Sequence, residues 1–86
     1  MLTLHITRQV RNFLKTLDPK QYSQVTRKIF SLLDTGTAND SKKLKGCDYL
    51  RVDIGEYRII YRVENNCVYV QFIGKRNDSE IYKALR

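Results

Sequence analysis

The feature that most constrains the fold is a series of three alternating apolar and polar runs in the last third of the chain. The runs span residues 49–54, 57–64 and 67–73. Gly55-Glu56 separates the first two runs and Asn65-Asn66 the last two, and each pair has the length and composition of a two-residue hairpin loop. This spacing predicts an antiparallel three-strand meander.

Side chains alternate between the two faces of a strand, so pairing across these loops sorts the residues by face. The predicted opposite pairs are Asp53 with Arg58, Arg51 with Ile60, Tyr49 with Arg62, and Arg62 with Tyr69. One face is therefore basic and aromatic. The other face is apolar and needs a second layer to cover it. It collects Leu50, Val52, Ile54, Ile59, Tyr61, Val63, Val68, Val70 and Phe72.

The first half of the chain supplies that layer. Residues 2–6 alternate like a short strand, and Thr7 has the character of a helix N-cap. Asp18-Pro19 then predicts the N-cap and first position of a second helix, which runs to about residue 34 and stops at Gly36. The apolar residues of this second helix fall on one stripe, namely Tyr22, Val25, Ile29, Leu32 and Leu33.

These elements predict a single α+β domain over residues 1–86. A short N-terminal strand comes first, followed by a two-helix hairpin that packs on one face of the meander. Residues 35–45 are polar and rich in lysine, which indicates a surface loop. Asp78 or Ser79 caps a short C-terminal helix.

The charge balance indicates an anionic partner. Sixteen Lys and Arg against nine Asp and Glu give a formal net charge of +7, for which nucleic acid is the first candidate. A membrane surface fits less well, because the basic residues lie mainly on predicted strands and loops. The chain lacks an apolar run of about 20 residues and an N-terminal signal pattern, so a cytoplasmic location is expected.

Cysteine and histidine usage predicts neither a disulfide nor a metal centre. Cys47 and Cys67 are expected to stay reduced in a chain without a signal segment. His5 is the only histidine, and together with two distant cysteines it fits no spacing of metal ligands. No phosphate-binding glycine loop is present, so no cofactor is expected.

Two motifs resemble the RelE/ParE superfamily of toxins from type II toxin–antitoxin systems. Residues 55–61, Gly-Glu-Tyr-Arg-Ile-Ile-Tyr, resemble a strand motif of the whole superfamily. Gly74-Lys75-Arg76, with Tyr82 six residues beyond Arg76, is similar to the RelE branch. The resemblance covers nearly the whole chain. It implies a RelE-like fold, a cognate antitoxin protein as partner, and cleavage of mRNA on the ribosome.

The resemblance also implies roles for individual residues. By position, Arg58, Arg76 and Tyr82 match residues implicated in cleavage, and Arg51 matches a position that holds the RNA backbone. Asp53 departs from the pattern, because well-known RelE toxins carry a basic residue there. Two lysines are further candidate contacts to RNA, namely Lys75 beside the motif arginine and Lys45 in the basic loop.

The residue types suit metal-free cleavage, in which the ribose 2′-OH attacks the adjacent phosphorus. This reaction requires a base, an acid and positive charge at the phosphorane. Arginine supplies the charge best, because its planar fork binds two phosphate oxygens and stays protonated. Tyr82 either stacks on a base or exchanges a proton with the help of cationic neighbours.

Three alternatives remain open on the sequence alone. Arg58 and Asp53 could form no more than a surface ion pair, worth about 0.2–1 kcal/mol. The chain could be a gyrase-poisoning toxin of the ParE branch. It could also be a RelE-fold binding protein in which Asp53 weakens cleavage, because a carboxylate beside the scissile phosphate repels it. Assays of translation and of DNA supercoiling separate these functions.

Overall fold

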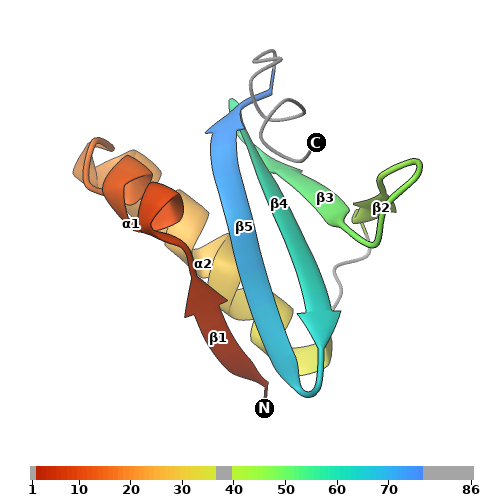
Figure 1. Ribbon diagram of the computed structural model, residues 1–86. Coiled ribbons are helices and arrows are strands. Elements are labelled where there is room, and N and C mark those ends of the chain that lie inside the picture. Colours follow the sequence, from red (N-terminus) through yellow and green to blue (C-terminus); the bar gives the residue numbers. More distant parts are fainter. Residues whose placement is uncertain (1, 37–39, 77–86) are drawn as a thin grey trace.

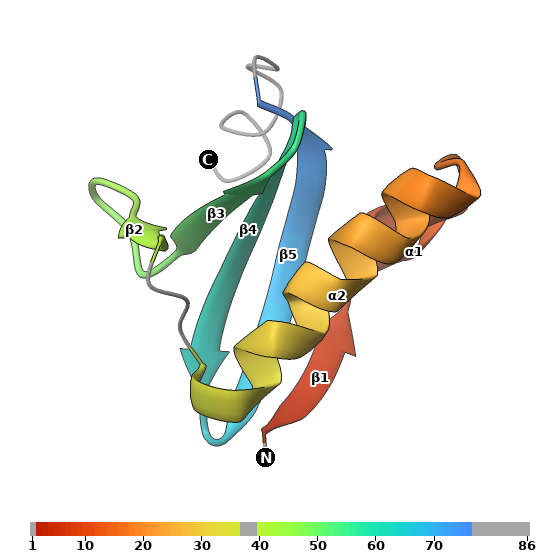
Figure 2. The same ribbon diagram turned by 180° about the vertical axis from the view of Figure 1, so that it is seen from behind.

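The computed structural model describes residues 2–36 and 40–76. Its elements are β1 (Thr3–Ile6), α1 (Arg8–Leu14), α2 (Pro19–Thr35), β2 (Lys42–Lys43), β3 (Leu50–Ile54), β4 (Tyr57–Glu64) and β5 (Cys67–Lys75). The strands form one sheet in the order β1-β5-β4-β3-β2 (Figure 1). Both helices lie on one face of this sheet (Figure 2). We call the opposite face, on which no helix of the described residues lies, the open face.

The predicted meander is present. β3 pairs with β4 and β4 with β5, both antiparallel, and three of the predicted pairs form: Asp53 with Arg58, Arg51 with Ile60, and Arg62 with Tyr69. Tyr49 lies one residue before the start of β3, so its predicted pairing is not part of the ladder. Asn65 and Asn66 both have positive φ, 51° and 61°, as a primed two-residue turn requires.

Two further strands extend the meander into a mixed five-stranded sheet. β1 pairs with β5 in parallel, with Leu4 opposite Val68 and Ile6 opposite Val70. The chain between these parallel strands contains both helices and then β2, β3 and β4. β2 is a two-residue strand inside the segment that we predicted as a loop, and it pairs antiparallel with β3.

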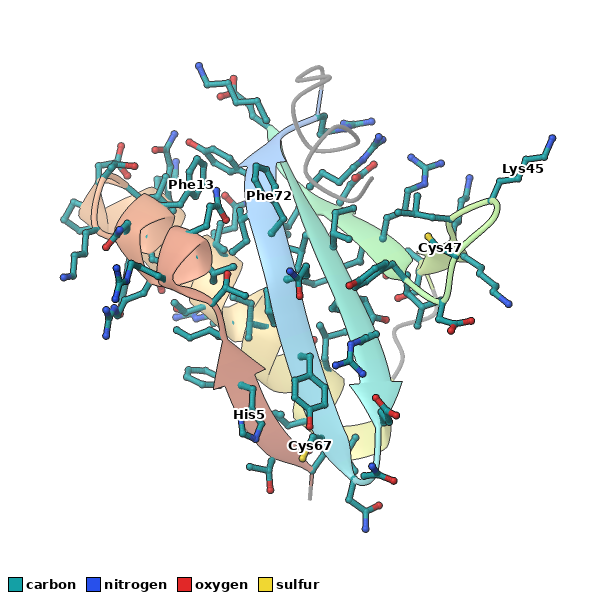
Figure 3. All side chains as sticks on the ribbon, viewed as in Figure 1. His5, Phe13, Lys45, Cys47, Cys67 and Phe72 are labelled. Carbon is teal, nitrogen blue, oxygen red and sulfur yellow. The ribbon has the colours of Figure 1, made fainter. Side chains whose placement is uncertain are left out.

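The prediction for Phe72 was wrong. The β4–β5 register shifts at Ile60/Tyr61, so that Tyr61 pairs with Val70 while Ile60 pairs with Phe72. Gln71 is the extra residue of this β-bulge, and every residue after it changes face. Phe72 therefore lies beside Ile60 on the open face, in front of β5 in Figure 3. The fully buried Ile73 takes its place in the core.

The core lies between the two helices and the other sheet face. Val10 and Leu14 of α1 are buried there, as are three residues of the predicted stripe on α2: Val25, Ile29 and Leu32. Tyr22 does not belong to that stripe, because 48% of it remains exposed. Phe13 contacts Tyr57 edge-on, with ring centroids 5.7 Å apart, which ties α1 to the start of β4.

The predicted helix ends are confirmed. The Thr7 side chain accepts a hydrogen bond from the Val10 amide, and the Asp18 side chain accepts one from the Gln21 amide. Gly36 caps α2 with φ of 79°.

No helix in the described part of the chain is long and apolar enough to cross a membrane. The predicted C-terminal helix, with its cap at Asp78 or Ser79, lies outside the described residues.

Candidate functional site

The first part of the candidate site is an ion pair on the open face, at the end of the β3–β4 hairpin. Asp53 and Arg58 lie directly opposite each other on these strands. Arg58 donates from Nε to Asp53 Oδ1 at 2.8 Å and from Nη2 to Oδ2 at 3.4 Å. The Arg58 side chain is only 12% exposed and that of Asp53 is 31% exposed. The pair is thus fork-to-carboxylate and partly shielded from water.

Arg76 joins the same carboxylate from the end of β5. Its Nε lies 3.4 Å from Asp53 Oδ2, and its backbone amide donates to the Glu56 carbonyl at 2.9 Å. The backbone bond fixes the end of β5 against the hairpin turn. The Arg76 side chain is 53% exposed, so its guanidinium is accessible to solvent and ligands. Two residues that are 18 positions apart in the sequence are thereby brought together by Asp53.

Arg51 completes what we call the arginine cluster: Arg51, Arg58 and Arg76 around Asp53. The hydrogen bond from Arg58 is the main cause that lowers the pKa of Asp53 from its ordinary value of 3.8. The positive charges of Arg58, Arg76 and Arg51 lower it further, while partial burial opposes them. Asp53 is therefore ionised at neutral pH. Among the described residues that define the cluster, three guanidinium charges face one carboxylate, so positive charge predominates.

The other predicted site residues are placed less closely together. Lys75 is exposed and lines, with Arg76, Gly55 and Glu56, a hollow of about 520 Å³ beside the cluster. It pairs with Tyr57, so its side chain starts from the helix-covered face. Lys45 lies at the tip of the β2–β3 connection and points away from the sheet (Figure 3). Tyr82 lies outside the described residues.

Arg51 also borders a smaller hollow at the edge of the open face. Asp40, Lys42, Arg51 and Asp53 line this space of about 110 Å³. Lys42 is the partner of Arg51 in the β2–β3 ladder, which places a fourth cation beside the cluster. Sequence reasoning treated this lysine as part of a loop, because a two-residue strand carries too little pattern to be predicted.

A second group of side chains, which sequence reasoning did not assemble, lies at the other end of the open face. His5 stacks on Tyr69 with ring centroids 4.9 Å apart, and the Arg62 guanidinium carbon lies 4.2 Å from the centre of the same ring. A hydrogen bond with Cys67 raises the pKa of Tyr69, so its ring is a neutral phenol at physiological pH. Cys47 and Cys67 are both free thiols in the structure.

The described residues provide no centre for a metal. Within residues 2–36 and 40–76, no group of three His, Cys, Asp or Glu side chains lies close enough together to hold a metal ion. The open face instead carries arginine side chains, whose planar guanidinium groups are suited to binding oxyanions such as phosphate. The fold and the arginine cluster together define a small basic α+β protein with clustered guanidinium groups on the sheet face opposite its two helices.

The comparison with protein families identifies the class more closely. The family model described as the ParE toxin of the type II toxin–antitoxin system parDE matches residues 4–80. The chain belongs to this family and is a toxin of a toxin–antitoxin module. The resemblance to the RelE/ParE superfamily is thus confirmed. No curated protein matches the sequence.

Several solved structures with a similar fold are RelE toxins, alone or in complex with an antitoxin. The isolated RelE toxin of E. coli is 22% identical, with a TM-score of 0.77 over 99% of this chain and 95% of that one. The matching chain in the RelE–RelB complex of Pyrococcus horikoshii is 20% identical, with a TM-score of 0.76 over 91% of this chain and 98% of that one. A toxin–antitoxin complex of Mycobacterium tuberculosis is 23% identical, with a TM-score of 0.74 over 87% and 98%. These matches confirm the predicted RelE-like α+β fold.

Proposed function

We propose that this toxin is an endoribonuclease that cleaves mRNA on the ribosome and so inhibits translation in the cytoplasm. The observation that carries the proposal is the arginine cluster, in which Arg58 and Arg76 share one carboxylate. Cleavage by the ribose 2′-OH builds negative charge on a phosphorane, and preorganised guanidinium groups stabilise such charge. The geometry supplies two of them at one point, at the edge of a hollow.

Asp53 defines where the scissile phosphate would bind. A carboxylate and a phosphate both offer oxygen acceptors to a guanidinium fork, so Asp53 occupies the position of a substrate oxyanion. The more exposed Arg76 is the first to meet RNA. Arg51 then holds the backbone, and the phosphate replaces Asp53 as a ligand of the cluster. The lowered pKa of Asp53 makes it a poor base, which favours a positioning role over proton transfer.

Tyr82 remains the proposed third cleavage residue, assigned by the resemblance of its position to the RelE branch. It would stack on a base of the mRNA or exchange a proton during the reaction. Lys75 lies next to Arg76, and its charge would add to the attraction of the RNA backbone. Lys45 would contact RNA at a distance from the cleaved bond, because it lies at the loop tip.

A cognate antitoxin is the proposed protein partner. Similar structures include the intact RelBE toxin–antitoxin complex of E. coli and the RelE–RelB complex of Pyrococcus horikoshii. The net charge of +7 and the basic open face favour an antitoxin segment rich in acidic residues, which would exclude RNA from the cluster. Binding of such a segment should weaken as the salt concentration rises.

A second candidate function is the poisoning of DNA gyrase. The matching family model is described by a ParE toxin, and ParE-type toxins of this superfamily act on gyrase. A basic open face suits DNA as well as RNA. The convergence of Arg58 and Arg76 on one carboxylate favours the nuclease, because gyrase poisoning needs no phosphorane clamp. A RelE-fold binding protein with weakened cleavage is the third possibility.

Two substitutions test the clamp. Arg58→Ala and Arg76→Ala should each lower ribosome-dependent cleavage about 100-fold or more, as the loss of one transition-state donor does elsewhere. Arg27→Ala is the matched control, since it removes one positive charge from the exposed face of α2. Circular dichroism checks that each variant is folded. An Arg58→Ala protein that cleaves at the parent rate refutes the assignment.

A further inference from the structure

The second group on the open face comes from three neighbouring strands. His5 belongs to β1, Tyr69 to β5 and Arg62 to β4, and the two ladders place His5 opposite Tyr69 and Tyr69 opposite Arg62. The three side chains therefore stack in a row across the sheet, an imidazole on a phenol beneath a guanidinium. We call this row the His5–Tyr69–Arg62 platform.

One end of the platform is available to a ligand. β1 is the last strand of the sheet in the described part of the chain, so no neighbouring strand covers the outer side of His5. His5 is exposed, while the Tyr69 ring is held between its two neighbours. Glu64 forms an ion pair with Arg62 and fixes the guanidinium over the ring. The aromatic surface is thus ordered before any ligand arrives, which reduces the entropy lost on binding.

The platform and the arginine cluster belong to one continuous surface. Arg58 and Arg62 lie four residues apart on β4, about 13 Å at ~3.3 Å per residue, and both point to the open face. Ile60 and Phe72 lie between them, so the surface is apolar in the middle, with the arginine cluster at one end and the Arg62–Glu64 ion pair at the other. His5, at the free end of the platform, lies two strands from β4, roughly 10 Å further across the sheet at ~4.8 Å between neighbouring strands. The diagonal from Arg58 to His5 is therefore roughly 16 Å, which about five stacked nucleotides of a single strand would span.

We propose that the His5–Tyr69–Arg62 platform binds a base of single-stranded RNA by stacking, while the arginine cluster binds a phosphate of the same strand. Exposed aromatic rings on an open sheet, flanked by arginines, are a general device for holding unpaired bases. Stacking tolerates all four bases, so the platform would add affinity without sequence preference. The proposal deepens the proposed nuclease function, because the ligand is the substrate strand.

An abasic probe separates stacking from charge. Fluorescence anisotropy would measure binding of a 2′-O-methyl adenine hexamer and of a 2′-O-methyl abasic hexamer with the same number of phosphates. Neither probe can be cleaved by 2′-OH attack and no ribosome is present, so failure of the nuclease function leaves the measurement intact. His5→Ala should weaken binding of the adenine hexamer about fivefold or more and leave binding of the abasic hexamer unchanged.

Two variants control for charge and for structure. His5→Phe keeps a ring on Tyr69 and should retain the parent affinity for the adenine hexamer. Tyr22→Ala removes an exposed aromatic side chain from α2, on the other side of the molecule, and should change neither affinity. Circular dichroism would confirm that both proteins are folded.

Three results overturn the proposal. The first is a parent protein that binds the two hexamers equally well, since no base is then recognised. The second is a His5→Ala protein that loses affinity for both hexamers to the same extent. The third is a His5→Ala protein that binds both hexamers normally but no longer binds an acidic antitoxin segment, which would make the platform a protein interface.

Discussion

Asp53→Asn is the substitution that examines the arginine cluster most closely. Asparagine keeps an oxygen that can accept the 2.8 Å hydrogen bond from Arg58 Nε, so the guanidinium should stay in place. The substitution removes one negative charge from the centre of the cluster, so the positive potential of the three guanidinium groups at this point rises. We expect faster cleavage of mRNA, because the substrate phosphate no longer competes with Asp53.

The size of the effect follows from Coulomb's law. A phosphate on the same guanidinium would lie about 6 Å from the Asp53 carboxylate, where repulsion costs ~0.7 kcal/mol in bulk water and ~2.8 kcal/mol at an effective dielectric constant of about 20. The Asp53 side chain is 31% exposed, so its surroundings lie between these limits. If the repulsion that Asp53→Asn removes is ~1.4 kcal/mol, between these two limits, cleavage at low protein concentration should become about tenfold faster.

Single-turnover cleavage on mRNA-programmed ribosomes measures this gain, which should shrink as salt is added. Asp34→Asn is the matched control, because it makes the same change in net charge on the exposed face of α2. Loss of the ion pair should lower the free energy of unfolding by no more than about 1 kcal/mol. A tenfold or larger loss of cleavage in a stably folded Asp53→Asn protein would show that the carboxylate takes part in the reaction.

Three further predictions concern the stability of the fold, measured by urea unfolding. Tyr61→Phe removes a hydroxyl 2.6 Å from that of Ser41 and should cost about 1 kcal/mol; an unchanged midpoint would contradict this. Gly36→Ala should lower the free energy of unfolding more than Gly46→Ala does. Both glycines have φ near 80°, but only at Gly36 would the new methyl group lie 3.1 Å from a leucine side chain. Equal losses of stability in the two variants would contradict the packing argument. The pKa of Asp53 is lowered in the folded protein, so its stabilising contribution is present above its ordinary value of 3.8 and is lost as the pH falls through the folded-state pKa. The stabilities of the parent and of Asp53→Asn should therefore differ at pH 7, and the difference should shrink as the pH is lowered below 3.8; a difference that does not change with pH would contradict this.

Local signals in the sequence predicted the frame of the molecule. The two-residue loops at Gly55-Glu56 and Asn65-Asn66 fix the register of both hairpins, so the pairing of Asp53 with Arg58 followed directly. Helix caps at Thr7 and Asp18 are equally local, because each depends on a side chain and an amide three residues later.

Features that depend on distant residues were not predictable in the same way. Parallel pairing of β1 with β5 joins segments separated by more than 60 residues, so no turn signal could place His5 beside Tyr69. The bulge at Gln71 has no signature in the alternating pattern, and the prediction placed Phe72 in the core for that reason. Contact between Arg76 and Asp53 depends on where β5 ends against the hairpin turn, which strand patterns do not specify.

The most direct test of the proposed function is primer extension on an mRNA translated in a purified system with and without the toxin. A ribosome-dependent nuclease should produce discrete breaks within the translated region, with 2′,3′-cyclic phosphate ends, and no breaks when ribosomes are left out. The same protein should leave supercoiling of DNA by gyrase unchanged. Intact mRNA together with inhibited supercoiling would contradict the account and identify the toxin as a gyrase poison.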